Sequence, residues 1–275
     1  MEKPSVTKRK RLKIRARRVL TRRVLPFVAA LFLATPMASP VSKSLAHATD
    51  VPAKMPSPKA MQAAFFDQEL HDLYRDLKVE QQGLNYSVFE KAMTGYLNLE
   101  KEGKLGDKKL LTVIDFDLPS TEKRLWVLDL ASKQVVFHTL VAHGHNSGEN
   151  VATNFSNENE SNMSSLGFYV TQSEYNGKHG RSLKLQGVDE GYNTNAMMRS
   201  VVMHGADYVS EEFIRQYGRL GRSLGCPALP MDQYAQIIDA VGNGTCLFLN
   251  GNDASYSSKY LNQDVAMNTL LANNS

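Results

Sequence analysis

LLTVIDFDLPSTEKRLWVLDLASKQVVFHTLVAHG, residues 110–144, is the stretch of sequence that decides the fold. It holds three runs of β-branched, aromatic and aliphatic residues separated by short polar turns, at 110–118, 124–130 and 134–144. Such runs are typical of β-strands. The pattern resumes further along the chain and predicts strands at 167–175, 182–187, 200–206 and 245–250. With one helix expected at 231–241, the second half of the chain is predicted to be β-rich.

A helical periodicity precedes residue 108. Apolar side chains recur there at helical spacing, at Ala63, Phe66, Leu70, Leu73 and Leu77. Gly83 breaks this pattern, and Ser87 with Glu90 forms a capping box that predicts the start of a second helix, which ends in the glycine-containing stretch 103–106. The sequence therefore predicts an α+β fold, in which an N-terminal helical segment at 61–107 precedes a β-rich domain at 108–250.

Two polar segments interrupt or follow these elements. The region 145–165 is rich in Asn, Ser and Gly and almost free of large aliphatic residues. A loop of about twenty residues within a compact domain is usually functional or disordered, and we expect this one to cross near a cleft. Residues 251–275 are polar and are expected to form a loose C-terminal tail.

The composition is that of a globular protein, with 42% hydrophobic and 22% charged residues among 275. The formal net charge of +4 is unevenly distributed. Residues 1–48 hold 12 of the 32 Lys and Arg and a single acid, Glu2, whereas the remaining residues hold 20 Lys and Arg against 27 acids. The body of the chain is acidic, which gives a nucleic-acid partner no general electrostatic support.

Residues 1–48 have the three parts of an export signal. A basic stretch at 8–23 precedes an apolar run, VLPFVAALFLA (24–34), that is short for a membrane span. Ala46-His47-Ala48 offers a cleavage site, and a proline-containing linker follows at 49–60. We expect an exported protein of the periplasm or cell envelope with no stable membrane span after cleavage. A signal that stays attached as an anchor is the alternative.

The two cysteines have different surroundings. Cys246 lies in an apolar run and is expected to pack inside a strand, whereas Cys226 follows Gly225 in a loop, so a disulfide between them is not expected. A thiolate is a nucleophile, and His204, 22 residues before Cys226, is a candidate base for it. Gly225 permits a tight turn whose backbone N–H groups can form an oxyanion hole.

Several separated segments around this pair resemble the L,D-transpeptidases of bacterial cell-wall synthesis, in the murein L,D-transpeptidase catalytic-domain-like branch. The resemblance covers residues 83–250, and it is carried by VAHG (141–144), NFSN (154–157), SSLGFY (164–169), YNGKHG (175–180), VMHGADYVS (202–210) and GRLGRSLGCPALP (218–230). It implies an L,D-transpeptidase-like fold, a cysteine acyltransferase that acts on peptidoglycan stem peptides, and no cofactor.

Matched residue by residue, the resemblance implies that Cys226 is the nucleophile and His204 its base. It also implies that the backbone carbonyl of Gly205 orients the imidazole. Arg222 and Ser223 lie where the family's loop approaches the donor peptide.

The chain departs from the family at two positions in this loop. Leu224 stands where His or Trp is usual, and Ala228 stands where Arg is common. The first departure leaves His204 as the sole expected base. Because of the second, we expect Arg222 or Arg219 to bind a substrate carboxylate by bidentate pairing.

At several other residues, a purely structural role competes with a functional one. His138, His143 and His145 do not make a convincing metal site, because the side chain of His138 points to the opposite strand face and no Cys or carboxylate completes the set. His143 is more readily a pocket-wall or core residue, and Trp126 a core residue. His179 could contact substrate or cap a turn.

Two classes of function stay open. One is an enzyme that forms an acyl-enzyme with a stem tetrapeptide and passes it to an acceptor. The acceptor is a second stem, a free D-amino acid or water, which gives a cross-link, exchange or carboxypeptidation. The other is a catalytically silent peptidoglycan-binding protein. The retained Cys and His favour the enzyme, since a binding module has no use for a thiolate.

Overall fold

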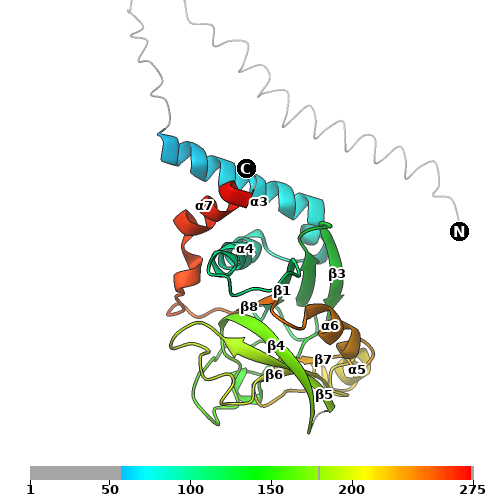
Figure 1. The fold of residues 1–275 in the computed structure, drawn as a ribbon. Helices are drawn as coiled ribbons and strands as arrows, with labels where there is room; N and C mark the ends of the chain where they lie inside the picture. The colour runs from blue at the N-terminus through cyan, green and yellow to red at the C-terminus, as the bar shows by residue number, and fades with distance from the viewer. Residues whose placement is uncertain (1–56, 179, 274–275) are drawn as a thin grey trace, which may run out of the picture. The chain divides into compact units, whose positions relative to one another are not determined.

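The computed structural model of the chain describes residues 57–178 and 180–273 (Figure 1). The predicted export signal at 1–48, most of the predicted linker and His179 lie outside the described residues. Within them, no helix is both long and apolar enough to cross a membrane.

The described chain begins with two helices and a 3-10 turn, which are α3 (Pro58–Leu77), η2 (Val79–Gln82) and α4 (Tyr86–Lys101). α3 begins inside the predicted linker, because Ser57 accepts a hydrogen bond from the N–H of Ala60 and caps the helix. α4 begins before the predicted capping box. Asn85 caps it by accepting the N–H of Ser87, so Ser87 lies in the first turn and the prediction that it caps the helix is wrong.

Within the described residues, eight strands form one mixed sheet in the order β3-β2-β1-β8-β4-β5-β6-β7. They are β1 (Leu110–Asp115), β2 (Leu125–Asp129), β3 (Gln134–Thr139), β4 (Gly167–Gly177), β5 (Gly180–Gly187), β6 (Val202–Gly205), β7 (Ala228–Leu229) and β8 (Cys246–Asn250). The pairs β1–β8 and β6–β7 are parallel, and the other neighbours are antiparallel. The expected α+β fold with a β-rich second half is confirmed.

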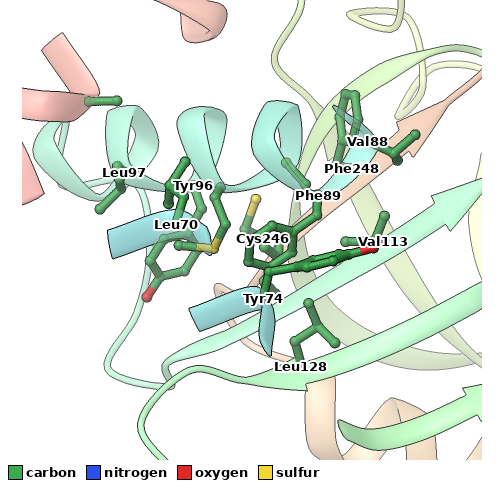
Figure 2. Packing of buried hydrophobic residues seen from close by; sticks show 14 of the residues in the cluster. Leu70, Tyr74, Val88, Phe89, Tyr96, Leu97, Val113, Leu128, Cys246 and Phe248 are labelled. Carbon is green, nitrogen blue, oxygen red and sulfur yellow. The ribbon is translucent and has the colours of Figure 1, made fainter. Parts of the chain in front are cut away.

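Apolar clusters cover both faces of the central strands, to which side chains point alternately along each strand. On β8, Cys246 and Phe248 pack under α3 and α4, and Figure 2 shows this cluster. Leu247 and Leu249 belong to the cluster on the opposite face, to which α6 (Tyr234–Val241) contributes its apolar side chains. The sheet is therefore the central layer of the described domain.

α4 lies very close to the sheet at Gly95. A Cβ added at this glycine would overlap the ring of Phe168 on β4. Trp126 on β2 belongs to the same buried cluster, which confirms its expected place in the core, and its ring stacks on that of His138 at 5.1 Å between centroids. The helical layer and the sheet are thus joined by tight packing.

The C-terminal segment is folded, so the expectation of a loose tail is wrong. It forms η4 (Lys259–Leu261) and α7 (Gln263–Asn273), and α7 lies beside α3 and α4 (Figure 1). The buried Asn98 of α4 holds this segment, since its Nδ2 donates to the carbonyls of Tyr260 at 2.6 Å and of Asn262 at 3.0 Å. Tyr260 and Ala266 are themselves buried.

Candidate active site

His204 is the third residue of β6 and is 2% exposed. It pairs with Ser182 of β5 on one side and with Ala228 of β7 on the other. Its Nδ1 lies 2.9 Å from the carbonyl oxygen of Gly205. Because a carbonyl oxygen only accepts, the proton of this hydrogen bond is on Nδ1, and Nε2 of the neutral ring is the nitrogen able to take up a proton.

Cys226 lies two residues before β7, so the pairing of β6 with β7 brings it beside the strand that holds His204. Its Sγ accepts a hydrogen bond from the N–H of Val202 at 3.4 Å and donates to the carbonyl of Ser200 at 3.7 Å. Val202 precedes His204 by two residues on β6. The cysteine and histidine singled out in the sequence are therefore brought to one region of the fold.

The two thiols differ as expected, and both are free. Cys226 is partly accessible to solvent, whereas Cys246 is fully buried on β8. Burial raises the pKa of the Cys226 thiol, although the Val202 N–H and the charge of Arg199 act in the opposite direction. The resting form is thus the neutral thiol, and a reaction at this sulfur requires a base.

The turn before Cys226 is held by Ser223. Its Oγ donates to the carbonyl of Cys226 at 2.6 Å and accepts the N–H of Gly225 at 3.1 Å. The Gly225 N–H is thus engaged within the turn, which differs from its predicted oxyanion role. Gly225 has φ +120, and a Cβ there would lie 2.7 Å from the carbonyl oxygen of Met163, so the position requires glycine. Leu224, at the position of the usual His or Trp, is 72% exposed.

The segment after β3 supports this turn. The N–H of Ser223 donates to the carbonyl of His143 at 3.0 Å, and the N–H of His145 donates to the carbonyl of Ser223 at 2.7 Å. The Asn- and Ser-rich region also contacts the turn, because Ser164 Oγ accepts from the N–H of Gly144 and donates to the carbonyl of Gly225. Region 145–165 therefore lies against the turn that precedes Cys226.

The two arginines predicted to bind substrate are paired within the protein. Arg222 and Arg219 both contact the carboxylate of Glu149, each at 2.9 Å. Arg222 also donates to the carbonyls of His145 at 3.1 Å and Gly148 at 3.0 Å, and its side chain is 11% exposed. The structure gives Arg222 a role in holding the loop, and neither guanidinium is presented without a carboxylate partner.

His143 is fully buried, as the core interpretation predicts. It is paired with the buried Arg124, whose guanidinium also donates to the carbonyls of Val141 at 3.0 Å and Leu118 at 2.7 Å. No group of three or more His, Cys, Asp or Glu in the described part of the chain could hold a metal ion.

Sequence reasoning missed two features next to the site. The first is α5 (Glu211–Tyr217), a short helix in which no side chain is buried, so no apolar stripe marks it. The second is Arg199, whose Nη2 lies 3.2 Å from the position that a Cβ at Gly225 would occupy. Arg199 lies shortly before β6, the strand that carries His204, and this position was its only signal in the sequence.

A partly accessible thiol that contacts the strand carrying an oriented, buried histidine, in a mixed sheet of an α+β fold, defines a candidate cysteine-dependent active site. The family described as the L,D-transpeptidase catalytic domain matches residues 80–250, which is more than half of the chain. The chain belongs to this family. Comparison with curated proteins finds no match.

Solved structures of low sequence identity match parts of this chain. An L,D-transpeptidase from Mycobacterium smegmatis is 13% identical with a TM-score of 0.33, and the match covers 52% of this chain and 59% of that one. The helical cell shape determining protein Pgp2 from Campylobacter jejuni is 13% identical with a TM-score of 0.36, over 65% of this chain and 63% of that one. This chain thus spans about six tenths of their lengths, and the family assignment depends on the match at 80–250.

Proposed function

We propose that this protein is a peptidoglycan L,D-transpeptidase that uses the thiolate of Cys226 to form an acyl-enzyme with a stem tetrapeptide and transfers the acyl group to an amine. The observation that carries the proposal is the placement of His204. Its Nδ1 is fixed on the carbonyl of Gly205, and its strand contacts the Cys226 sulfur two residues away, at Val202. The membership in the L,D-transpeptidase catalytic domain family supports the same chemistry.

The proposed reaction begins with proton transfer from Cys226 to Nε2 of His204. The sulfur attacks the peptide carbonyl before the terminal D-residue, and the Cys226 N–H stabilises the developing oxyanion, since the Gly225 N–H is bonded to Ser223. Protonated His204 then gives its proton to the departing amine of the D-residue. The thioester is finally attacked by the acceptor amine, which His204 deprotonates, and the thiol is restored.

The second candidate within this chemistry differs only in the acceptor. Water in place of the amine makes the protein an L,D-carboxypeptidase, and a free D-amino acid makes it an exchange enzyme. A catalytically silent peptidoglycan-binding protein is the remaining alternative. The hydrogen bond that fixes the tautomer of His204 argues against it, because binding alone needs no oriented base.

Purified protein incubated with tetrapeptide muropeptides tests the proposal. We expect an acyl adduct on Cys226 by intact-mass and peptide mass spectrometry, and release of the terminal D-residue. Cys226→Ala should abolish both, and Cys246→Ala, which removes a thiol buried on the other side of the core, should abolish neither. Product muropeptides then identify the acceptor. Turnover by Cys226→Ala, or an adduct on Cys246, would refute the mechanism.

We also propose that the protein is exported and acts in the periplasm or cell envelope. The basic and apolar segments at 8–34 and the family's substrate support this location. N-terminal sequencing of protein recovered from the periplasm tests it. We expect a start near Thr49, and an intact Met1 in soluble protein would contradict cleavage.

A further inference from the structure

Two main-chain groups of the segment Arg199–Val202 contact the Cys226 sulfur, and together they suit both of its protonation states. The neutral S–H donates to the carbonyl of Ser200 at 3.7 Å, whereas the sulfur accepts from the N–H of Val202 at 3.4 Å. Ser200 has φ +56, an uncommon conformation for a residue other than glycine. The main chain at this point is therefore held in an unusual shape next to the candidate nucleophile.

Arg199 fixes a loop that lies against the turn before the nucleophile. Its Nη1 donates to the carbonyl of Ser156 at 2.8 Å and to Ser165 Oγ, and its Nη2 donates to Ser161 Oγ at 3.0 Å and to the carbonyl of Met163 at 2.7 Å. All four acceptors belong to residues 156–165. The same Met163 carbonyl contacts Gly225, so one side chain ties this loop to the turn that presents Cys226.

The charge of Arg199 is not cancelled by a direct partner. Its four acceptors are neutral, and among the described residues no ion pair involves it. Arg219 and Arg222, by contrast, share Glu149. An uncompensated cation in a partly buried site interacts more strongly with a nearby anion than a paired surface cation does.

We propose that Arg199 is the positioning residue for the Cys226 thiolate, because its guanidinium ties the 156–165 loop to the turn at Gly225 and places a positive charge directly beside that turn. This inference builds on the proposed function and gives Arg199 a role toward the thiolate, which is distinct from the substrate-carboxylate binding predicted for Arg222 or Arg219. Burial raises the pKa of the Cys226 thiol, and Arg199 and the Val202 N–H lower it, which agrees with this assignment.

Other titratable groups also face this site. His204 lies on β6, the strand that begins at Val202, and burial and the charge of the Cys226 thiolate raise the pKa of Tyr208 to about 12. Glu158 and Tyr169 face Arg199, and burial raises the pKa of Tyr169 above its ordinary value. Both tyrosines are therefore neutral near pH 7, which leaves Arg199 as the charged side chain that acts on the pKa of the Cys226 thiol.

The test is the pH dependence of iodoacetamide alkylation at Cys226, followed by peptide mass spectrometry in full-length protein with no substrate. Arg199→Gln should move the midpoint to higher pH. The alkylation rate at pH 7 should then fall about tenfold for each pH unit by which the midpoint rises, while the rate at high pH is kept. Ser161→Ala is the matched control, because it removes one anchor of Nη2 and keeps the charge. Its midpoint should stay at that of the parent protein.

Arg199→Lys gives a second measurement if Arg199→Gln does not fold. Lysine keeps the charge but cannot make all four contacts, so we expect an unchanged midpoint with a lower melting temperature. The inference would be overturned if the alkylation midpoint of Arg199→Gln equalled that of the parent protein. It would also be overturned if the midpoint of Arg199→Lys, which keeps the charge, rose as far as that of Arg199→Gln. Alkylation needs no turnover, so a failure here is distinct from a failure of Cys226 to form an acyl-enzyme.

Discussion

Nη2 of Arg124 lies 2.7 Å from Nδ1 of His143, and both side chains are fully buried. A guanidinium nitrogen only donates, so Nδ1 is the acceptor and the proton of the neutral ring is on Nε2, which donates to the carbonyl of Gly148 at 3.2 Å. Burial and the charge of Arg124 lower the pKa of His143 to about 4. This pair holds the segment whose main chain bonds to Ser223, next to the candidate nucleophile.

The first prediction concerns pH and stability. His143 has a pKa of about 4 when folded and about 6.5 when unfolded. As pH falls, His143 is protonated in the unfolded chain before it is protonated in the folded protein. The stability that the neutral, buried His143 provides is therefore present above pH 6.5 and is lost by pH 4. The loss should be on the order of 3 kcal/mol. His143→Gln keeps an acceptor for Arg124 and a donor for Gly148 but does not titrate. This variant should therefore not show the loss of stability between pH 6.5 and pH 4 that His143 causes.

Urea unfolding between pH 4 and pH 7 measures the effect. His145→Gln is the control, because it changes an exposed imidazole on the same segment and should keep the pH dependence of the parent. Equal losses of stability in the parent and in His143→Gln would show that another group is responsible.

The second prediction compares two glycines with positive φ. Ala at Gly218, where φ is +71 and no atom lies within 4 Å of the added Cβ, should cost about 1–2 kcal/mol of backbone strain. Gly225→Ala should cost more, because its Cβ would lie 2.7 Å from the Met163 carbonyl. It should also slow alkylation of Cys226. Urea unfolding and alkylation rates measure both effects, and equal costs at the two positions would contradict the steric argument.

The third prediction concerns the contact between Asn98 and the C-terminal segment. Asn98→Ala should lower the free energy of unfolding by about 1–3 kcal/mol, because the carbonyls of Tyr260 and Asn262 lose a buried donor. Asn98→Asp should cost more, since it places a carboxylate against two carbonyl oxygens. Hydrogen exchange in α7 should rise in both variants. An Asp variant as stable as the parent would show that this contact does not hold the segment.

The fourth prediction uses the two free thiols. In native protein, iodoacetamide should modify Cys226 and leave Cys246 unmodified, because Cys246 is fully buried and its pKa is raised by that burial. In denaturant both should react. Peptide mass spectrometry distinguishes the two sites, and labelling of Cys246 under native conditions at the rate of Cys226 would contradict the packing shown in Figure 2.

The strands could be predicted because most of them carry their own signal. Runs such as that of β1 bury nearly every side chain and are bounded by polar turns. β7 has two residues, too few for any periodicity. α7 was missed because few of its side chains are buried, Ala266 and Met267 among them, and because its attachment depends on Asn98, more than 160 residues away.

At the site, too, residues with a local sequence signal could be predicted, whereas contacts set by the tertiary structure could not. Cys226 and His204 lie in local motifs, so both could be identified as candidate site residues from the sequence. The partner of an arginine, however, depends on tertiary structure. Glu149 lies about 70 residues before Arg222, and nothing in the sequence connects the two. Arg199 likewise has acceptors in a loop some 40 residues earlier, so only the fold distinguishes it from an ordinary surface cation.

The position of β8 has a consequence for how the chain folds. β8 is the last strand in sequence, yet it lies between β1 and β4 in the middle of the sheet. Until residues 246–250 pair, the sheet consists of two halves, β3-β2-β1 and β4-β5-β6-β7, each with an unpaired edge open to other chains. Insertion of this one strand closes both edges and joins the two halves, so we expect it to be the slow, late step of folding and the stage at which newly made protein is most prone to aggregate.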